Sequence, residues 1–302
     1  MVRHRRAIAL AAAAVVVAAL GVVVASVATT IRPSGADDSP PPPTPTVLEQ
    51  AAGAGRQWRL ETPNGPVHVW APAGYHADGA ATVVYVHGYY TDVDQAWDDH
   101  RLAEQFALSS INALFIVPEA PAHARNAVSW PELTALLTEV FGRIDVARPM
   151  GALVAVGHSG GYRTVDRWLD QPGLDEVIAV DSVYGDVDDL EGWLAGSPAH
   201  RLIMIGDDTL EWTEQLARDL GDDVVTLDRF PEDDDGIPPE AHAARVFYVR
   251  SQYGHMPLVT GGVALPMMLR LVPAEILADA PWHQPYGLPP RPIDAGVDGG
   301  GR

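Results

Sequence analysis

Ser159 lies in the short sequence Gly157-His158-Ser159-Gly160-Gly161, which fits the pattern G-x-S-x-G. This pattern is typical of a nucleophilic serine that a sharp strand-to-helix turn presents to a substrate. A serine hydroxyl is a weak nucleophile at neutral pH, so a neighbouring general base must take up its proton. The motif therefore predicts acyl-transfer chemistry, provided that the fold supplies the turn, a base and hydrogen-bond donors for a developing oxyanion.

The segments on either side of Ser159 indicate which kind of scaffold carries it. Residues 152–157 form a short apolar run, and residues 162–170 place Val165 and Trp168 on one face of a helix. A serine between a buried strand and a helix is what a nucleophile elbow requires. The GDSGG sequence of chymotrypsin-like proteases differs by one letter, but that fold places its serine among antiparallel strands. Secreted proteases of that fold often rely on disulfides, and this chain has no cysteine.

Strands and helices alternate between Arg59 and Leu271. Residues 58–74 predict two short strands around a turn at 63–65. Helical patterns between the later strands predict right-handed crossovers and a doubly wound, mostly parallel sheet, in which ligands bind at the carboxyl ends of the strands. Six apolar runs lack the alternation of half-buried strands, as expected for parallel strands covered on both faces: 81–88, 112–120, 152–159, 176–183, 201–208 and 244–251.

The clearest helix pattern begins at Leu133. Apolar residues recur from there to Ile144 with the spacing of one helix face. Ser129 and Glu132 have the spacing of a capping box, so we expect them to begin this helix.

The N-terminal residues predict export from the cytoplasm. Three arginines among the first six residues precede an uncharged stretch from Ala7 to Ala28, which reaches the roughly 17–25 residues of a membrane-spanning helix. This length favours an uncleaved membrane anchor, while small residues at Ser26 and Ala28 leave a cleaved signal peptide open. Because the arginines stay on the cytoplasmic side, either outcome places the remaining chain outside the cytoplasm, anchored or secreted.

The charge of the chain restricts its partners. Forty acidic residues face twenty basic ones, all of them arginine, which gives a net charge of −20. Such a field repels nucleic acid, so no nucleic-acid partner is expected. The acidic run 231–236 does not fit a calcium-binding EF-hand loop, because Pro231 and His242 occupy its first and last ligand positions. We predict neither a metal nor a cofactor.

With the motif in this context, residues 58–272 resemble the α/β-hydrolase superfamily. In that superfamily the first oxyanion donor is the backbone N–H after the nucleophile, which here belongs to Gly160. A second donor comes from the turn after an early strand, where His-Gly often stands. His87 and Gly88 match that turn, so the resemblance implies that the N–H of Tyr89 is the second donor. The imidazole of His87 itself is expected to be structural.

The resemblance also implies a catalytic triad in the order serine, acid, histidine. His255 follows the last predicted strand and is expected to be the general base. The acid is expected after the strand at 201–208, where the usual spacing favours Asp208 and leaves Asp207 as a close second. Asp181 is the third choice, because some lipases take their acid from the preceding strand.

These residues imply a serine hydrolase that forms an acyl-enzyme on Ser159. The segment between Tyr184 and Arg201 is too short for a large cap domain. A carboxylic ester or thioester is the favoured substrate, with an amidase or peptidase at the cell envelope and a non-catalytic hydrolase-fold binding module as alternatives. The partner is a small-molecule or cell-envelope acyl substrate. Residues that could meet it from near the strand ends are Tyr89, Tyr90, Tyr162, Tyr184 and Tyr253, together with Glu119 from a loop.

The domain organisation follows from these assignments. Residues 1–31 are the signal peptide or membrane anchor, and residues 32–46 are a proline-rich linker that favours extended polyproline II. Residues 47–280 form one α/β-hydrolase domain. Residues 281–302 are a tail rich in proline and glycine.

Overall fold

The computed structural model describes residues 47–185, 187–231 and 236–277. The predicted anchor or signal peptide, the linker and the C-terminal tail lie outside these residues, and their export function stays a prediction. Within the described ranges, no helix has the length and apolar character needed to cross a bilayer.

The described residues build one nine-stranded sheet with the strand order β1-β2-β4-β3-β5-β6-β7-β9-β8. Strands β1 and β2 pair with each other antiparallel, as the turn at 63–65 predicts, and β2 pairs antiparallel with β4. All other pairs are parallel, so the predicted doubly wound, mostly parallel sheet is confirmed. The strands are β1 (Arg56–Leu60), β2 (Val67–Ala71), β3 (Ala81–Val86), β4 (Ala113–Pro118), β5 (Leu153–His158), β6 (Glu176–Val180), β7 (Arg201–Gly206), β8 (Val224–Leu227) and β9 (Val246–Arg250).

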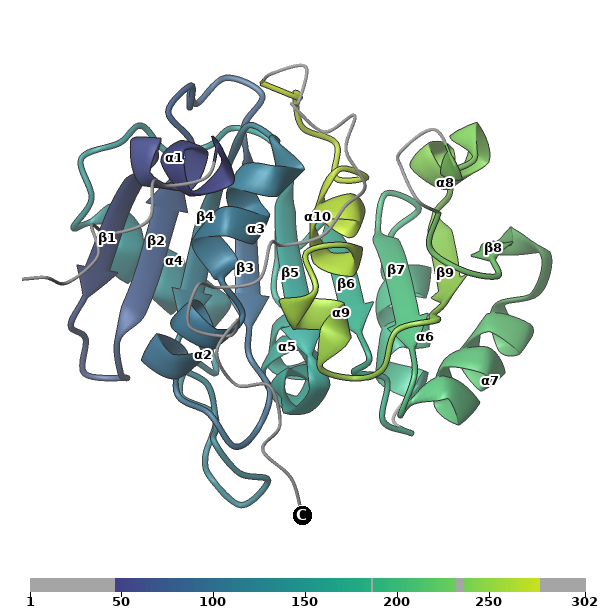
Figure 1. Cartoon of the computed structure of the whole chain (residues 1–302). Coiled ribbons are helices and arrows are strands. Elements are labelled where there is room, and N and C mark those ends of the chain that lie inside the picture. Colours follow the sequence, from purple (N-terminus) through teal and green to yellow (C-terminus); the bar gives the residue numbers. More distant parts are fainter. Residues whose placement is uncertain (1–46, 186, 232–235, 278–302) are drawn as a thin grey trace, which may run out of the picture. The chain divides into compact units, whose positions relative to one another are not determined.

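Helices cover both faces of this sheet (Figure 1). The helices whose buried side chains pack on one face are α1 (Val47–Ala54), α2 (Val93–Asp99), α3 (Leu102–Ser109), α8 (Pro239–Ala243), α9 (Pro257–Thr260) and α10 (Ala264–Leu269). Those of the other face are α4 (Leu133–Phe141), α5 (Tyr162–Leu169), α6 (Val187–Gly196) and α7 (Leu210–Leu220). Strands covered on both faces explain the continuous apolar runs of the sequence. Between β6 and β7 the described residues hold only α6, and no large cap is inserted there.

Two local features differ from the sequence expectation. Strand β8 was not predicted, because four partly exposed residues at a sheet edge carry little apolar signal. The capping box at Ser129 does not form: Glu132 is itself the N-cap of α4 and makes no capping hydrogen bond through its side chain. Gln171 replaces it, since its side-chain oxygen accepts the Leu133 N–H at 2.8 Å. The free backbone N–H at the start of α4 is thus satisfied by Gln171, which is distant in the sequence, and not by Ser129, as the local pattern predicts.

A buried ion pair links β6 and β7 at the residues where the two strands begin. The Arg201 guanidinium lies 3.3 Å from the carboxylate of Glu176, whose side chain is 2% exposed. The same guanidinium donates to the carbonyl oxygens of Ala241, Ala244 and Leu271. Arg201 therefore joins β6 and β7 to the chain around α8 and after α10.

Replacing Arg201 by methionine is expected to destabilise the domain strongly. The substitution keeps much of the apolar stem but leaves a buried carboxylate without its charge partner, which typically costs about 3–5 kcal/mol. Arg218→Met is the matched control, because Arg218 is 59% exposed and lies 3.6 Å from Glu214; we expect it to cost less than about 1 kcal/mol. Urea unfolding at pH 7.5 measures both changes. Equal effects of the two substitutions would contradict this account.

Candidate active site

Ser159 occupies a strained turn between β5 and α5. Its φ is +50°, in the left-handed region that residues with a Cβ rarely adopt. Glycine is needed beside it, because a Cβ on Gly161 would lie 2.6 Å from the carbonyl oxygen of Val86. A Cβ on Gly88 would lie 2.8 Å from the Cβ of Ser159. The close approach of these segments holds the serine at the carboxyl end of the sheet, as a nucleophile elbow requires.

His255 follows β9 and hydrogen-bonds an aspartate from the neighbouring part of the sheet. Its Nδ1 lies 2.5 Å from Oδ2 of Asp181, whose side chain is fully buried. Because Nδ1 is engaged by the carboxylate, Nε2 of the neutral ring is left as the proton acceptor. His255 and Ser159 both line one cavity. Asp181 follows the end of β6 and His255 follows the end of β9, so these two strands position the hydrogen-bonded pair.

The loop between β7 and α7 fixes the carboxylate of Asp181. The backbone N–H groups of Asp207 and Thr209 donate to Oδ1 at 2.8 and 2.9 Å, and the Thr209 hydroxyl donates to the same oxygen at 2.8 Å. The carboxylate also lies at the beginning of α7, where the helix dipole favours negative charge. Burial opposes ionisation of Asp181, but hydrogen bonds from His255, Asp207 and Thr209 outweigh it and hold the pKa well below its usual range. The anion is thereby kept in place beside His255.

The three aspartates weighed from the sequence take different places from those expected. Asp208, the first choice, has a side chain that is 67% exposed and an oxygen 3.7 Å from His255 Nδ1. Its backbone N–H instead donates to Asp181 at 3.2 Å, and Asp207 likewise contributes its backbone N–H. His255 therefore hydrogen-bonds Asp181, the third choice, and not Asp208, because the loop 207–209 turns its backbone N–H groups toward the Asp181 carboxylate.

Asp181, Asp208 and His255 offer three potential metal ligands within 4.8 Å of one another. The sequence did not reveal this cluster, because its members come from three separate strand ends. Both oxygens of Asp181 already accept hydrogen bonds from N–H groups of His255 and of the loop 207–209. Hydrogen bonds from the protein thus already occupy both oxygens of this carboxylate and orient the imidazole of His255.

The turn after β3 packs against the elbow. A Cβ on Gly160 would lie 2.4 Å from the ring of Tyr89, so the residues expected to supply both oxyanion donors are adjacent. His87 is completely buried; its Nδ1 lies 2.8 Å from the Gly88 oxygen, and its Nε2 accepts the Ala120 N–H at 3.1 Å. Its ring therefore orders the turn from within and does not reach the cavity, as expected.

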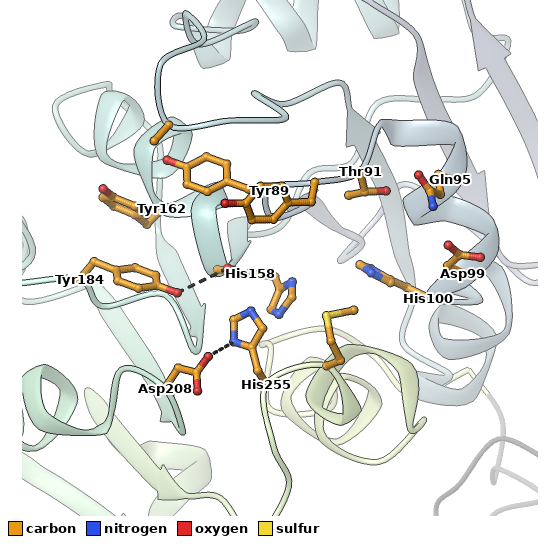
Figure 2. Close-up of a pocket in the computed structure, with 15 residues that line it drawn as sticks. Tyr89, Thr91, Gln95, Asp99, His100, His158, Tyr162, Tyr184, Asp208 and His255 are labelled. Atoms are coloured by element: carbon orange, nitrogen blue, oxygen red, sulfur yellow. Dashed lines mark hydrogen bonds and ion pairs between the residues drawn. The ribbon is translucent and has the colours of Figure 1, made fainter. Parts of the chain in front are cut away.

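Ser159 and His255 face a cavity of about 630 Å³ (Figure 2). Of the six residues proposed from the sequence to meet the substrate, Tyr89, Tyr90, Tyr162 and Tyr184 line it. Tyr184 Oη lies 3.4 Å from Ser159 Oγ. Two expectations were wrong: Tyr253 packs on Phe230, and Glu119 accepts the Val93 N–H beside His87.

The sequence pattern does not indicate the polar residues at the other end of the cavity. Figure 2 shows Gln95, Asp99 and His100 on the opposite side of His255 from Tyr162 and Tyr184. His158 lies between these two ends. Its place inside the G-x-S-x-G motif was the available signal, but the second position of that motif accepts any residue, so it carried no weight.

The pH profile of hydrolysis is expected to reflect His255. The hydrogen bond to Asp181 raises the pKa of this imidazole above its usual 6.5, against the effect of burial, and the charges of Asp181, Asp208 and Asp207 add to the rise. A general base must be neutral to accept a proton. Activity should therefore be lost as the pH falls, with a midpoint above 6.5. Measuring kcat/KM for nitrophenyl acetate between pH 5 and 9 tests this; a midpoint below 6 would contradict it.

Comparisons with known proteins found similarity only in three dimensions. No family model matches the chain, and no curated protein matches it. The chain is similar to the feruloyl esterase module from Clostridium thermocellum complexed with sinapinate, at 12% identity and a TM-score of 0.49 over 74% of this chain and 89% of that one. It is also similar to an S-formylglutathione hydrolase from Agrobacterium tumefaciens, at 10% identity and a TM-score of 0.46 over 72% and 92% of the two chains. At these identities the similarity concerns the fold.

Proposed function

We propose that this protein is a serine hydrolase that cleaves a carboxylic ester or thioester through an acyl-enzyme on Ser159. The observation that carries the proposal is the hydrogen bond between the buried Asp181 carboxylate and the partly exposed His255, together with a serine on a strained elbow that lines the same cavity as this histidine. Strained backbone is maintained where function requires it. A nucleophile, a base and a group that orients the base are the parts of an acyl-transfer site.

The first half of the reaction forms the acyl-enzyme. His255 Nε2 takes the proton of Ser159 Oγ while that oxygen attacks the carbonyl carbon. The backbone N–H groups of Gly160 and Tyr89 stabilise the oxyanion that develops on the carbonyl oxygen. The intermediate collapses, the bond to the alcohol or thiol breaks, and the leaving atom receives the proton from His255.

The second half releases the acid. Water gives a proton to His255 and attacks the acyl carbon; the second intermediate then expels Ser159 Oγ, which regains its proton from the imidazolium. Asp181 stays ionised throughout, fixes the ring tautomer and stabilises the imidazolium. None of these steps calls for a metal or a cofactor.

An ester or thioester is the favoured substrate because its leaving group departs more readily than an amine. Labelling with a fluorophosphonate probe tests the proposal directly. Labelling of the wild-type protein but not of the Ser159→Ala variant is the expected result. If the probe does not label the wild-type protein and the protein hydrolyses no activated ester, the non-catalytic binding module becomes the favoured alternative.

A further inference from the structure

Tyr184 places a hydroxyl group beside the oxygen that is expected to attack the substrate. Its Oη lies 3.4 Å from Ser159 Oγ, and this is the one hydrogen bond that the side chain of Ser159 makes within the described residues. Both side chains line the cavity. The proton transfers assigned to His255 do not use the Tyr184 hydroxyl, so its position at the reacting oxygen calls for a role of its own.

The direction of this hydrogen bond follows from the proton that Ser159 must give up. A serine hydroxyl has one proton and two lone pairs. Because Nδ1 of His255 is engaged by Asp181, the proton of Ser159 has to go to Nε2. One lone pair attacks the carbonyl carbon, and the second is free to accept a hydrogen bond. Tyr184 is therefore the donor when Ser159 is ready to react.

The loop after β6 and two aromatic rings hold the Tyr184 hydroxyl in place. Asp181 is the first residue of this loop, so one short segment carries both the hydrogen-bond partner of His255 and the tyrosine. The ring centroid of Tyr184 lies 5.1 Å from that of Tyr162 (Figure 2) and 5.9 Å from that of Trp212. A donor that packing has already aimed at the reacting oxygen costs no reorganisation during the reaction.

The surroundings of Tyr184 keep its hydroxyl protonated. Burial raises the pKa of this hydroxyl above its usual value of about 10, against the effect of the hydrogen bond with Ser159. The negative charges of Asp181 and Asp208 add to the rise, and Tyr89 acts in the same sense. A phenol that keeps its proton can donate a hydrogen bond throughout the neutral pH range.

The length of this hydrogen bond suits a contact that acts in the transition state. At 3.4 Å it is longer than the roughly 2.7–2.8 Å of an ordinary pair of hydroxyl groups, so it contributes little while Ser159 is neutral. Catalytic hydrogen bonds are often long in free enzymes and shorten in the complex. Negative charge builds on Oγ as its proton passes to His255, and a hydroxyl donor approaches a charged oxygen to roughly 2.5–2.7 Å. An interaction that strengthens in this way lowers the barrier.

We propose that Tyr184 is a further catalytic residue, whose hydroxyl donates a hydrogen bond to Ser159 Oγ while this oxygen carries negative charge. This inference rests on the proposed serine hydrolase function and deepens it. In the first half of the reaction, the proton of Oγ passes to His255 Nε2 while the bond from Oγ to carbon forms. In the second half that bond breaks, its electron pair stays on Oγ, and the proton returns from His255. Tyr184 keeps its own proton in every step.

Tyr184→Phe removes the donor and keeps the ring. The rate constant of labelling by the fluorophosphonate probe measures the attack by Ser159 Oγ without the later hydrolysis. It should fall by about 10- to 100-fold, as expected for the loss of a hydrogen bond to a charged oxygen. The value of kcat/KM for nitrophenyl butyrate should fall by a similar factor.

Tyr75→Phe is the matched control. The Tyr75 side chain is also partly buried, and its hydroxyl donates one hydrogen bond, to the carbonyl oxygen of Ala147. Tyr75 is not among the described residues that line the cavity. The same substitution there should leave the labelling rate at the wild-type value, so any loss that follows merely from removing a partly buried hydroxyl is measured separately.

A difluorotyrosine at position 184 gives a readout that a purely structural role would not change. Fluorine makes the phenol a stronger acid, so this side chain loses its proton at a lower pH than tyrosine does. A phenolate cannot donate and places negative charge beside Oγ. The labelling rate, measured between pH 7 and 10, should therefore fall on the alkaline side at a lower pH than in the wild type. Tyr184→Phe should show no alkaline loss in this range. If Tyr184→Phe does not fold, the difluorotyrosine protein decides, because it keeps both ring and hydroxyl.

Three outcomes would overturn the inference. They are labelling of Tyr184→Phe at the wild-type rate, an equal loss in Tyr75→Phe, and a difluorotyrosine protein whose alkaline loss coincides with that of the wild type. Any of them, together with a labelled wild-type protein and an inactive Ser159→Ala, rejects only the role of Tyr184. Ester hydrolysis that persists in Ser159→Ala, or a wild-type protein that the probe does not label, would reject the proposed function and the role of Tyr184 with it.

Discussion

Replacing Ser159 by alanine is expected to reduce hydrolysis of nitrophenyl acetate and butyrate by about 10⁶-fold, because the variant loses the only group that forms the acyl-enzyme. The side chain keeps its Cβ, so the strain at a φ of +50° is the same in both proteins. The fold should therefore survive, and thermal unfolding should show a midpoint within a few degrees of the wild type. Initial rates of the domain from Val47 onward measure the effect.

His255→Ala is the companion variant for this prediction. Groups that act as one unit lose activity together, so His255→Ala should be comparably inactive and the double variant little worse than either single one. Fluorophosphonate labelling should fail in both single variants. Losses that multiply in the double variant would mean that Ser159 and His255 act independently, and the proposed mechanism would be wrong.

The elbow could be predicted from the sequence because all of its determinants are local. An apolar run, a G-x-S-x-G turn and an amphipathic helix lie within twenty residues around Ser159, and each has its own periodicity. The parallel strands were equally visible as apolar runs. What the sequence missed was the edge strand β8, whose partly exposed residues give no such signal.

The aspartate that hydrogen-bonds His255 could not be predicted from the sequence, because it depends on how two loops meet. Asp181 has a φ of +47°, a conformation that aspartate tolerates better than most residues. Asp207 and Asp208 resemble it in sequence, each standing just after a strand. Only the fold shows that the loop 207–209 presents backbone N–H groups, which need an acceptor and find the carboxylate of Asp181.

The buried environment of His158 was equally hidden. A histidine inside the elbow motif can face solvent, core or substrate, and its type does not distinguish these cases. Its ring packs against those of His100 and His255, which lie about sixty and one hundred residues away in the sequence. The packing around this ring thus depends on contacts between residues far apart in the sequence.

Asp181→Asn is expected to lower kcat by about 10⁴-fold, because an amide in place of the carboxylate favours the wrong imidazole tautomer and no longer stabilises the imidazolium. Asp208→Asn should cost less than about 10-fold, since its side chain is mostly exposed and water screens its charge. Asp207→Asn should behave like Asp208→Asn, because the backbone N–H that holds Asp181 is unchanged. Turnover of nitrophenyl butyrate by the three variants ranks the acids, and a larger loss in Asp208→Asn would return the role to that residue.

The residual activity of Asp181→Asn carries a second, independent signature. The hydrogen bond to Asp181 is the largest cause that raises the pKa of His255, while burial lowers it. Removing the negative charge therefore leaves burial to dominate, and the acid limb of the pH profile should move to lower pH. Asp208→Asn should move the limb less, because Asp208 acts on the ring only through its charge at a longer distance. A variant that merely misfolds loses amplitude without moving the midpoint, so a shift in the midpoint separates positioning of the base from a general loss of structure.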